Sequence, residues 1–350
     1  MKKRIVISSL VGRGGTFQYI CLLASNLTKY ADISMLIPKY SDASLVNKKI
    51  NLLRTKAPPS AIRTIFLSLN IVQHARNIKK LNAQNPDVLI FADIHPWHVL
   101  YWPFLKAKKK ISVIHDAEIH SGEANAWMLR KITAFFLRKS DKIIVLSKSQ
   151  KKIIQEKGFG AKVILSIHGH FDFFSKYAKS VKEEPGTILF FGRIKEYKGL
   201  KYLLEASSLI KIKHKIMIVG EGDLSKYDLT GIEVHNKFIP DPKVANYFRR
   251  ASIVVLPYIG ATQTGIIPIA YSFKKPVVVT NVGSLPDVVI NGKTGFIVCS
   301  KDPQKLAEKI LKILSDDSLR KKMGNSAYRF MKENLNWKKI SEDLNFRLFP

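Results

Sequence analysis

Short apolar stretches alternate with helical patterns along the whole chain. In the first half these stretches are "RIVISSL", "ISMLI", "DVLIFA", "KKISVIH", "KIIVLS" and "KVILSI". The second half repeats the arrangement with "TILFFG", "KIMIVG", "IEVHNKF", "SIVVLPY", "PVVVTN" and "GFIVC". Continuous apolar strands separated by helices are typical of parallel sheets that helices cover on both faces. The pattern therefore predicts an α/β protein with two doubly wound, Rossmann-like sheets.

The two halves are separated by a stretch that has no hydrophobic period. "HGHFDFFSKYAKSVKEEPG" follows Ile167 and ends in Glu-Glu-Pro-Gly, which is a linker composition. We expect an N-terminal domain at 1–170, a linker at 171–186 and a C-terminal domain at 187–330. A helical stretch at 331–350 is expected to return to the N-terminal domain. Ligands of such sheets bind beyond the C-terminal strand ends, so two facing domains predict a central cleft.

Composition narrows the class of protein. Hydrophobic residues make up 46% and charged residues 24% of the 350 residues, which is a globular composition. Cys21 and Cys299 both stand in apolar contexts, and we interpret them as buried thiols in a reducing compartment. The sequence has no Asp-x-Asp pair after a strand and no His/Cys cluster, so neither a metal nor another cofactor is expected.

The net charge points to an anionic partner. The chain has 58 Lys and Arg residues against 27 Asp and Glu residues, a surplus of +31. In "LRKITAFFLRKSDK", basic pairs alternate with apolar residues at near-helical spacing, as in a basic helix on an anionic membrane surface. The alternative is a core helix whose solvated face is basic. Nucleic acid is not expected, because no zinc-finger, RNP-type or leucine-zipper pattern is present.

No uninterrupted apolar segment approaches the roughly 18–20 residues that a membrane-spanning helix needs. "MKKRIVISSLVGRGG" begins like a signal peptide, but its apolar run is short and ends in an Arg-Gly-Gly turn. We interpret it as a first strand. The expected location is cytoplasmic, peripheral on the inner face of the cell membrane.

Two loops are candidates for chemistry. In "SSLVGRGGTFQYI", Gly12, Gly14 and Gly15 lie between a strand and a helix, where free backbone amides can meet a polar or anionic ligand. Glycines are also common at such turns for steric reasons. In "ILFFGRIKEYKGLKYLLEA", Arg193 and Lys198 follow a strand that ends at Gly192 and could together hold one diphosphate. Two solvated surface cations are the alternative.

An ordered set of motifs resembles glycosyltransferase family four, the retaining nucleotide-sugar transferases with the GT-B architecture. "FFGRIKEYKGLKYLLEA", "IMIVGEGDL", "RRASIVVLPY", "KKPVVVTNVGSLPDVVINGKTGFIV" and a late "NW" resemble its donor-binding domain. "SVIHD" and "VILSIHGHFD" are similar to strands of its first domain. The likeness spans nearly the whole chain, and its order is more specific than any single motif.

The resemblance implies roles for particular residues. Arg193 and Lys198 would hold the donor phosphates and stabilise the leaving nucleoside diphosphate, while His115 would hydrogen-bond a sugar hydroxyl. These three are the candidate catalytic residues. The candidate donor-binding residues are Gly14, Gly15, Gly192, Thr262, Gln263, Thr264, Gly265 and Ile266. The candidate acceptor-side residues are Thr16, His95, Asp116 and Glu118.

The loop "GATQTGIIPIAY" departs from the family pattern. Family members usually carry two glutamates eight positions apart here, but this chain has Ala261 or Thr262 at the first position and Ile269 at the second. Either catalysis has been lost or neutral groups replace the carboxylates. We favour the second interpretation, because hydroxyl and amide side chains, and the amides of Thr264 to Ile267, can serve a sugar and its diphosphate.

The sequence thus predicts a metal-independent, retaining glycosyltransferase that uses a nucleotide-sugar donor. In such enzymes the first domain binds the acceptor, and the basic first half suggests a lipid-linked sugar or a growing cell-surface glycan. Two alternatives stay open: a catalytically impaired scaffold on a membrane surface, and a nucleotide-sugar epimerase.

Overall fold

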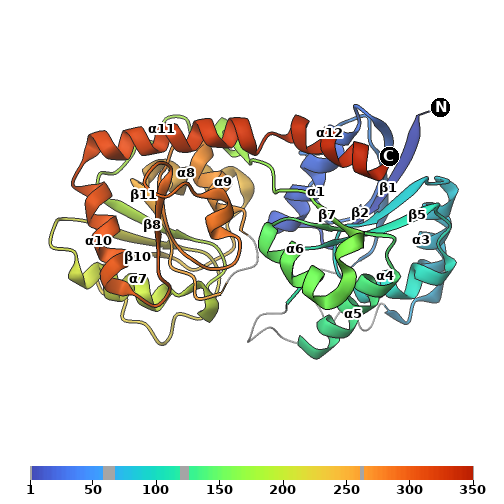
Figure 1. The fold of residues 1–350 in the computed structure, drawn as a ribbon, viewed down its shortest axis with the longest axis horizontal. Helices are drawn as coiled ribbons and strands as arrows, with labels where there is room; N and C mark the ends of the chain where they lie inside the picture. Colours follow the sequence, from blue (N-terminus) through green and yellow to red (C-terminus); the bar gives the residue numbers. More distant parts are fainter. Residues whose placement is uncertain (1, 58–67, 119–125, 261–263, 350) are drawn as a thin grey trace. The chain divides into compact units, whose positions relative to one another are not determined.

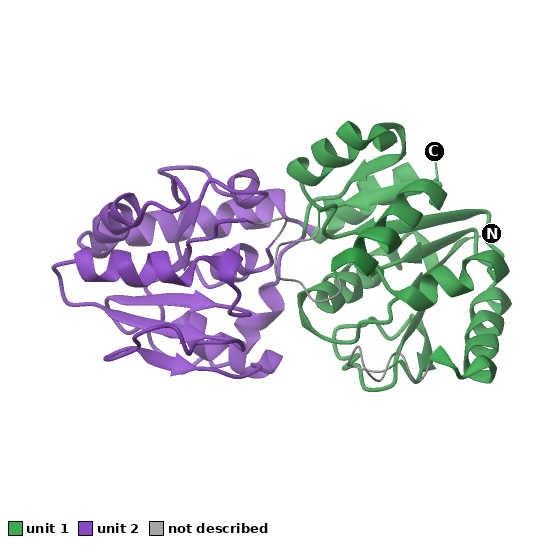
Figure 2. Cartoon of the chain, turned by 90° about the horizontal axis from the view of Figure 1, so that it is seen from below, with its two compact units in different colours: residues 1–119, 123–168, 337–350 green, residues 120–122, 169–336 purple. Residues whose placement is uncertain are grey.

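The computed structural model describes residues 2–57, 68–118, 126–260 and 264–349, which form two compact units. Unit 1 consists of 1–119, 123–168 and 337–350, and unit 2 of 120–122 and 169–336 (Figure 2). The units therefore divide near 168 and 336, where the sequence analysis placed boundaries at 170 and 330. Part of the expected linker packs into unit 2, where Phe171, Phe173 and Phe174 are buried.

In the described residues, unit 1 is built on a seven-stranded parallel sheet with the order β3-β2-β1-β4-β5-β6-β7 (Figure 1). The strands are β1 (Lys3–Ser8), β2 (Ala31–Pro38), β3 (Asn51–Thr55), β4 (Val88–Phe91), β5 (Lys109–Ile114), β6 (Lys142–Val145) and β7 (Val163–Leu165). The helices are α1 (Gly14–Leu27), α3 (Ile71–Ala83), α4 (Pro96–Tyr101), η1 (Trp102–Phe104), α5 (Ala126–Lys139), α6 (Lys148–Ile154), η2 (Gln155–Phe159), η3 (Gly160–Lys162) and α12 (Trp337–Leu348).

Each face of this sheet has its own hydrophobic core. One core joins α1 and α12, through residues such as Leu23 and Leu344, to the strands. The other joins α3, α4, α5 and α6 through residues such as Leu81, Tyr101 and Phe136. The inner strands are largely buried on both faces, which explains why they read as continuous apolar runs.

Unit 2 contains, in its described part, a six-stranded parallel sheet with the order β10-β9-β8-β11-β12-β13. The strands are β8 (Thr187–Phe191), β9 (Lys215–Val219), β10 (Glu233–His235), β11 (Ile253–Leu256), β12 (Val277–Thr280) and β13 (Gly295–Val298). The helices are η4 (Asp172–Lys176), η5 (Glu196–Lys198), α7 (Leu200–Leu209), α8 (Asp241–Arg250), α9 (Ile266–Ser272), η6 (Leu285–Val288), α10 (Pro303–Leu314) and α11 (Asp317–Asn334). Leu203 of α7 and Ile310 of α10 share one core with the sheet.

Two expectations from the sequence are wrong. Cys21 is buried, but Cys299 is exposed, because it follows the last residue of β13 and so lies outside the strand's buried span. The apolar stripe of α5 does not face a membrane, since Ile132, Phe136 and Leu137 pack into the core of unit 1. The alternative of a core helix with a basic solvent face is therefore correct for this stripe.

A buried polar cluster lies at the carboxyl end of β4. The imidazole of His98 is fully buried, with Nε2 2.8 Å from the hydroxyl oxygen of Ser8 and Nδ1 3.1 Å from the carbonyl oxygen of Asp93. Burial lowers the pKa of His98 from 6.5 to about 4. The ring is thus neutral at pH 7, and charging it in this site costs free energy.

This cluster predicts acid sensitivity of unit 1. Between pH 6.5 and pH 4 the unfolded chain takes up a proton at His98 that the folded chain does not, so stability is lost as the pH falls, by at most about 1.4 kcal/mol per pH unit for this group. In His98→Asn, the loss of unfolding free energy from pH 7 to pH 5 should be smaller. All four tryptophans belong to unit 1, so urea titrations followed by tryptophan fluorescence measure it. An unchanged pH dependence in the variant would contradict the assignment.

Candidate active site

The site in unit 2 lies where the strand order reverses. β8 and β11 are neighbours in the sheet, but they are separated in the chain by β9 and β10. Loops that leave the carboxyl ends of two such strands diverge and leave room for a ligand between them. Arg193 and Lys198 follow β8, and the stretch that begins at Pro257 follows β11. The topology therefore brings the predicted cation loop and the uncharged loop to the same edge of one sheet.

Backbone contacts hold these two loops together. The carbonyl oxygen of Tyr197, in η5, accepts hydrogen bonds from the amides of Ile259 at 2.8 Å and Gly260 at 3.3 Å. Gly199 has a φ of +66°, and a Cβ there would lie 2.0 Å from the carbonyl oxygen of Pro257. Only glycine suits this position, because both the backbone conformation and the close approach exclude a side chain. The loop that carries Lys198 is thus fixed against the exit of β11.

Lys198 is the most unusual side chain of this edge. Only 9% of it is exposed, and its amino group donates a 3.0 Å hydrogen bond to the hydroxyl oxygen of Tyr258. The same amino group lies 4.9 Å from the centre of the Tyr258 ring, within cation–π distance. Among the described residues no carboxylate pairs with Lys198. An ammonium group has three donors, so donors remain for a ligand.

Arg193 precedes Lys198 in the same loop, and the two side chains differ in burial. Its side chain is exposed, and none of the described carboxylates forms an ion pair with it. Gly192, which precedes it, has a φ of +111°, and a Cβ there would lie 3.0 Å from the Lys198 nitrogen. Gly192 therefore keeps open the space next to the amine. The site holds one buried and one exposed cation, both without an acidic partner in the described chain.

The uncharged loop is described only in part. Thr262 and Gln263 lie outside the described residues. The Thr264 hydroxyl accepts a 3.2 Å hydrogen bond from the Ile266 amide. The sequence analysis expected this amide to be available to a phosphate, but it already has a partner. A Cβ at Gly265 would lie 2.8 Å from the Phe171 ring, which explains a glycine at this position.

In unit 1 the glycine-rich loop leaves β1 and is held by a buried carboxylate. Asp93, which follows the neighbouring strand β4, accepts hydrogen bonds at Oδ2 from the amides of Leu10 at 2.8 Å and Val11 at 3.1 Å, and from the Ser9 hydroxyl at 2.9 Å. Burial raises the pKa of this carboxyl group. The loop then turns at Gly14, whose φ is +78°, into α1.

His115 directly follows β5 at the same edge of this sheet. Its Nε2 lies 3.1 Å from the carbonyl oxygen of Ala92, so Nε2 carries the proton and Nδ1 is left as an acceptor. Burial lowers the pKa of His115, and Asp116 opposes this shift. A neutral imidazole held in this tautomer can accept a hydrogen bond from a hydroxyl group.

The other predicted residues of unit 1 have different surroundings. His95 caps α4, where its Nδ1 accepts a 3.1 Å hydrogen bond from the Trp97 amide, and burial lowers its pKa to about 4. Gly15 and Thr16 lie in the first turn of α1, and no atom within 4 Å would contact a Cβ at Gly15. Glu118 is exposed and lines a hollow beside α5.

The sequence analysis missed two residues that hold the predicted ones in place. Tyr258 holds Lys198, and Asp93 holds the glycine-rich loop. Both follow the last residues of central strands by no more than two positions, and a polar residue at a strand exit is the signal that could have identified them. Within the described ranges, no group of three or more His, Cys, Asp or Glu residues could hold a metal. In the same ranges, no helix is long and apolar enough to cross a membrane.

Family comparisons match both halves of the chain. Residues 13–173 match the model described as "Glycosyltransferase Family 4", and residues 185–316 match the model described as "Glycosyl transferases group 1". Each match covers most of one unit and includes its candidate site.

The chain is also similar to individual glycosyltransferases and to a solved structure. The uncharacterized glycosyltransferase MJ1178 of Methanocaldococcus jannaschii is 27% identical over 248 residues, which are 66% of this chain and 67% of that protein. The capsular polysaccharide biosynthesis glycosyltransferase CapM of Staphylococcus aureus is 28% identical over 181 residues, 48% of this chain and 47% of CapM. The solved structure of Anabaena Alr3699/HepE in complex with UDP-glucose has a TM-score of 0.75 at 14% identity and covers 99% of both chains. The chain therefore belongs to the family-four glycosyltransferases and has the GT-B fold of two Rossmann-like domains.

Proposed function

We propose that this glycosyltransferase moves a sugar from a nucleoside-diphosphate donor to a lipid-linked or cell-surface glycan acceptor, with retention of anomeric configuration and without a metal. The proposal rests most heavily on Lys198. Its amine is nine-tenths buried at the exit of β8, where its described partner is a neutral phenol. A buried cation with unused donors favours a ligand that brings negative charge.

The proposed reaction is a transfer on the same face of the sugar. The bond between the anomeric carbon and the β-phosphate oxygen breaks, and its electron pair goes to the departing nucleoside diphosphate. An acceptor hydroxyl oxygen forms the new bond to the anomeric carbon from the same face, and its proton passes to the departing phosphate. Lys198 and Arg193 stabilise the charge that grows on this phosphate, which lowers the barrier more than it strengthens ground-state binding. His115 accepts a hydrogen bond from a sugar hydroxyl through Nδ1.

The absence of glutamates from residues 260–271 fits a binding role for that loop. In a same-face mechanism no protein carboxylate becomes covalently attached to the sugar, so losing one removes a contact rather than a step. Two named relatives support the donor and acceptor classes: HepE was solved with UDP-glucose, and CapM is named for capsular polysaccharide biosynthesis. An anionic membrane surface is the third proposed partner, and the proposed location is cytoplasmic and peripheral.

The surface of unit 1 supports the membrane part of the proposal. Unit 1 has 31 Lys and Arg residues against 11 Asp and Glu, whereas unit 2 has 27 against 16. Helices α3, α4 and α5 contain no acidic residue. Large apolar side chains are exposed on or beside these helices, and they are Leu69, Ile71, Val72, Leu100, Phe104 and Trp127. Exposed apolar groups among cations suit the interface of an anionic bilayer.

Removing a site cation should reduce turnover. Arg193→Ala and Lys198→Gln should each lower kcat on the order of 10²-fold or more, because each removes a stabilising group of the transition state. The donor KM should change much less. Release of nucleoside diphosphate measures turnover, with the donor found by thermal stabilisation against a panel of nucleotide-sugars.

Lys201→Gln is the matched control, since Lys201 is an exposed cation at the start of α7. Its turnover should stay within twofold of the unmodified chain. Unchanged turnover in both site variants would sink the assignment. Donor binding without any transfer or hydrolysis in the unmodified chain would instead favour the scaffold alternative.

A chelator should leave the activity unchanged. The two cations can neutralise the diphosphate that a divalent metal neutralises in other transferases. Turnover is measured before and after dialysis against EDTA, and again after addition of Mn²⁺. Activity that disappears with EDTA and returns with Mn²⁺ would contradict a metal-independent reaction.

The protein should sediment with anionic vesicles at low salt. Binding should fall with neutral vesicles, and with 1 M salt, where the screening length decreases from about 10 Å to about 3 Å. Phe104→Ser should weaken sedimentation, because Phe104 is 59% exposed on the α4 side of unit 1. Phe346→Ser is the control, since Phe346 is 72% exposed on α12, which packs on the opposite face of the sheet. Equal loss in both variants would count against docking through this face.

A further inference from the structure

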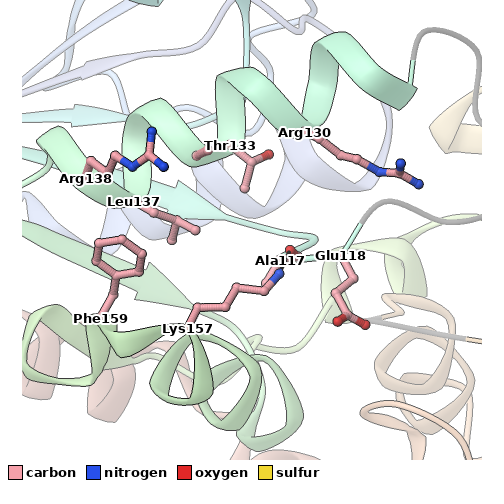
Figure 3. A pocket seen from close by; sticks show the side chains of 9 residues that line it. Ala117, Glu118, Arg130, Thr133, Leu137, Arg138, Lys157 and Phe159 are labelled. Carbon is pink, nitrogen blue, oxygen red and sulfur yellow. Dashed lines mark hydrogen bonds between the residues drawn. The ribbon is translucent and has the colours of Figure 1, made fainter.

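A hollow in unit 1 lies between α5 and the chain that follows α6 (Figure 3). Its volume is about 540 Å³, and it is separate from the residues assigned to the donor. The lining residues are Ala117, Glu118, Arg130, Thr133, Ala134, Leu137, Arg138, Lys157 and Phe159. A space of this size holds a small ligand or the head of a larger one.

The lining combines an apolar end with three cationic side chains. Leu137 and Phe159 provide the apolar part at one end of the hollow (Figure 3). Arg130, Arg138 and Lys157 provide the charge, and within the described ranges none of the three forms an ion pair with a carboxylate. Cations that lack acidic partners leave their charge to a ligand or to water.

Two of these cations form a ridge on α5. Arg130, Ala134 and Arg138 are spaced by four residues, so they lie on one face of the helix. The same three residues also line a second hollow on the other side of the ridge, with Phe135. The Cα atoms of Arg130 and Arg138 are separated by about 12 Å along the helix axis, and the small Ala134 lies between them. Figure 3 shows the two guanidinium groups apart, so both exposed side chains have to turn toward Ala134 to meet on one diphosphate.

A buried hydroxyl group supplies an independent indication of a ligand. Thr133 is only 4% exposed, and its Oγ1 has no hydrogen-bond partner in the described chain. Figure 3 shows this side chain on the side of α5 that faces Lys157 and Ala117. Lys157 crosses the hollow and donates a 3.0 Å hydrogen bond to the carbonyl oxygen of Ala117. An unpaired buried hydroxyl costs free energy, and a polar ligand would remove that cost.

The hollow lies next to the expected acceptor edge of unit 1. Ala117 and Glu118 line it, and they follow His115 at the carboxyl end of β5 by two and three residues. A ligand held in the hollow by one end can therefore extend toward the residue proposed to contact the transferred sugar. Glu118 is the one carboxylate among the described lining residues, and carboxylates accept hydrogen bonds from sugar hydroxyls.

We propose that the hollow beside α5 binds the diphosphate of a lipid-linked acceptor. Arg130 and Arg138 hold the phosphates, Lys157 and the Thr133 hydroxyl add hydrogen bonds, and Leu137 and Phe159 contact the first part of the lipid chain. This inference rests on the proposed transfer to a lipid-linked acceptor, and it names the chemical group by which that acceptor is recognised. Binding of the phosphate end leaves the sugar end of the acceptor free to reach His115.

The test uses the full chain with farnesyl diphosphate as a soluble probe, and with farnesol and inorganic diphosphate as its two halves. Calorimetry should show that farnesyl diphosphate binds at least tenfold more tightly than either half. Arg130→Gln combined with Arg138→Gln should weaken this binding at least tenfold, because two charge-assisted contacts are lost. Thr133→Val should keep or raise the melting temperature while it weakens binding several-fold, which a merely structural hydroxyl would not do.

Two control variants locate the ligand. Lys211→Gln combined with Lys213→Gln removes the same charge from exposed positions of unit 2, and it should leave the affinity unchanged. Lys198→Gln should also leave it unchanged, since that amine belongs to the donor edge. Equal loss in the Lys211 and Lys213 control, or loss only in Lys198→Gln, would overturn the assignment.

Other lipids and the donor reaction complete the test. Short-chain phosphatidylglycerol that binds as tightly as farnesyl diphosphate would indicate a headgroup docking site and overturn the acceptor assignment. If inorganic diphosphate binds as tightly as farnesyl diphosphate, the hollow recognises only an anion, and the acceptor assignment is overturned as well. Any nucleotide-sugar hydrolysis without acceptor should be unchanged in the α5 variants, and an unmodified chain that shows neither hydrolysis nor transfer would refute the proposed function separately.

Discussion

The contact between Lys198 and Tyr258 joins the exits of two central strands, and the candidate donor site depends on it. Tyr258 is itself held in place, because its carbonyl oxygen accepts a 2.6 Å hydrogen bond from the Thr280 hydroxyl at the end of β12. The exits of β8, β11 and β12 are thus linked through one side chain and its backbone. A lysine tail has many rotamers in water, and the buried phenol restricts this one to a single position. The amine is therefore placed before any ligand arrives.

A phenol holds this amine differently from a carboxylate. A paired carboxylate would neutralise the ammonium group, and an incoming phosphate would have to displace it. Tyr258 contributes a hydroxyl oxygen and the negative face of its ring, so the positive charge stays available. The missing loop glutamates act in the same direction, because residues 260–271 bring no negative charge to this edge. The amine therefore keeps a positive charge that no described carboxylate compensates, and the proposed recognition of a diphosphate requires such a charge.

The sequence was sufficient for features that depend on local pattern. Buried parallel strands appear in the sequence as apolar runs. Of the described strands, only β3 was not predicted, because it is an edge strand with the mixed sequence "NLLRT". Lys198 could be found as a cation after a strand, but its partner could not, since Tyr258 lies 60 residues away in the chain. Asp93 contacts Leu10 across 83 residues for the same reason. Contacts of this kind arise from strand order, which apolar periodicity does not specify.

Helix α5 shows why a basic amphipathic pattern is ambiguous. Core packing and membrane docking both require an apolar stripe opposite a charged one, so the sequence cannot distinguish them. In this protein the core takes Ile132, Phe136 and Leu137, and the arginines remain outside. Once the apolar stripe is buried, the helix backbone is held in place, and the exposed side chains of Arg130 and Arg138 project from one face of it. A helix that is packed in the core sets the separation of the two Cα atoms, whereas a loosely docked helix could offer only general attraction to a surface.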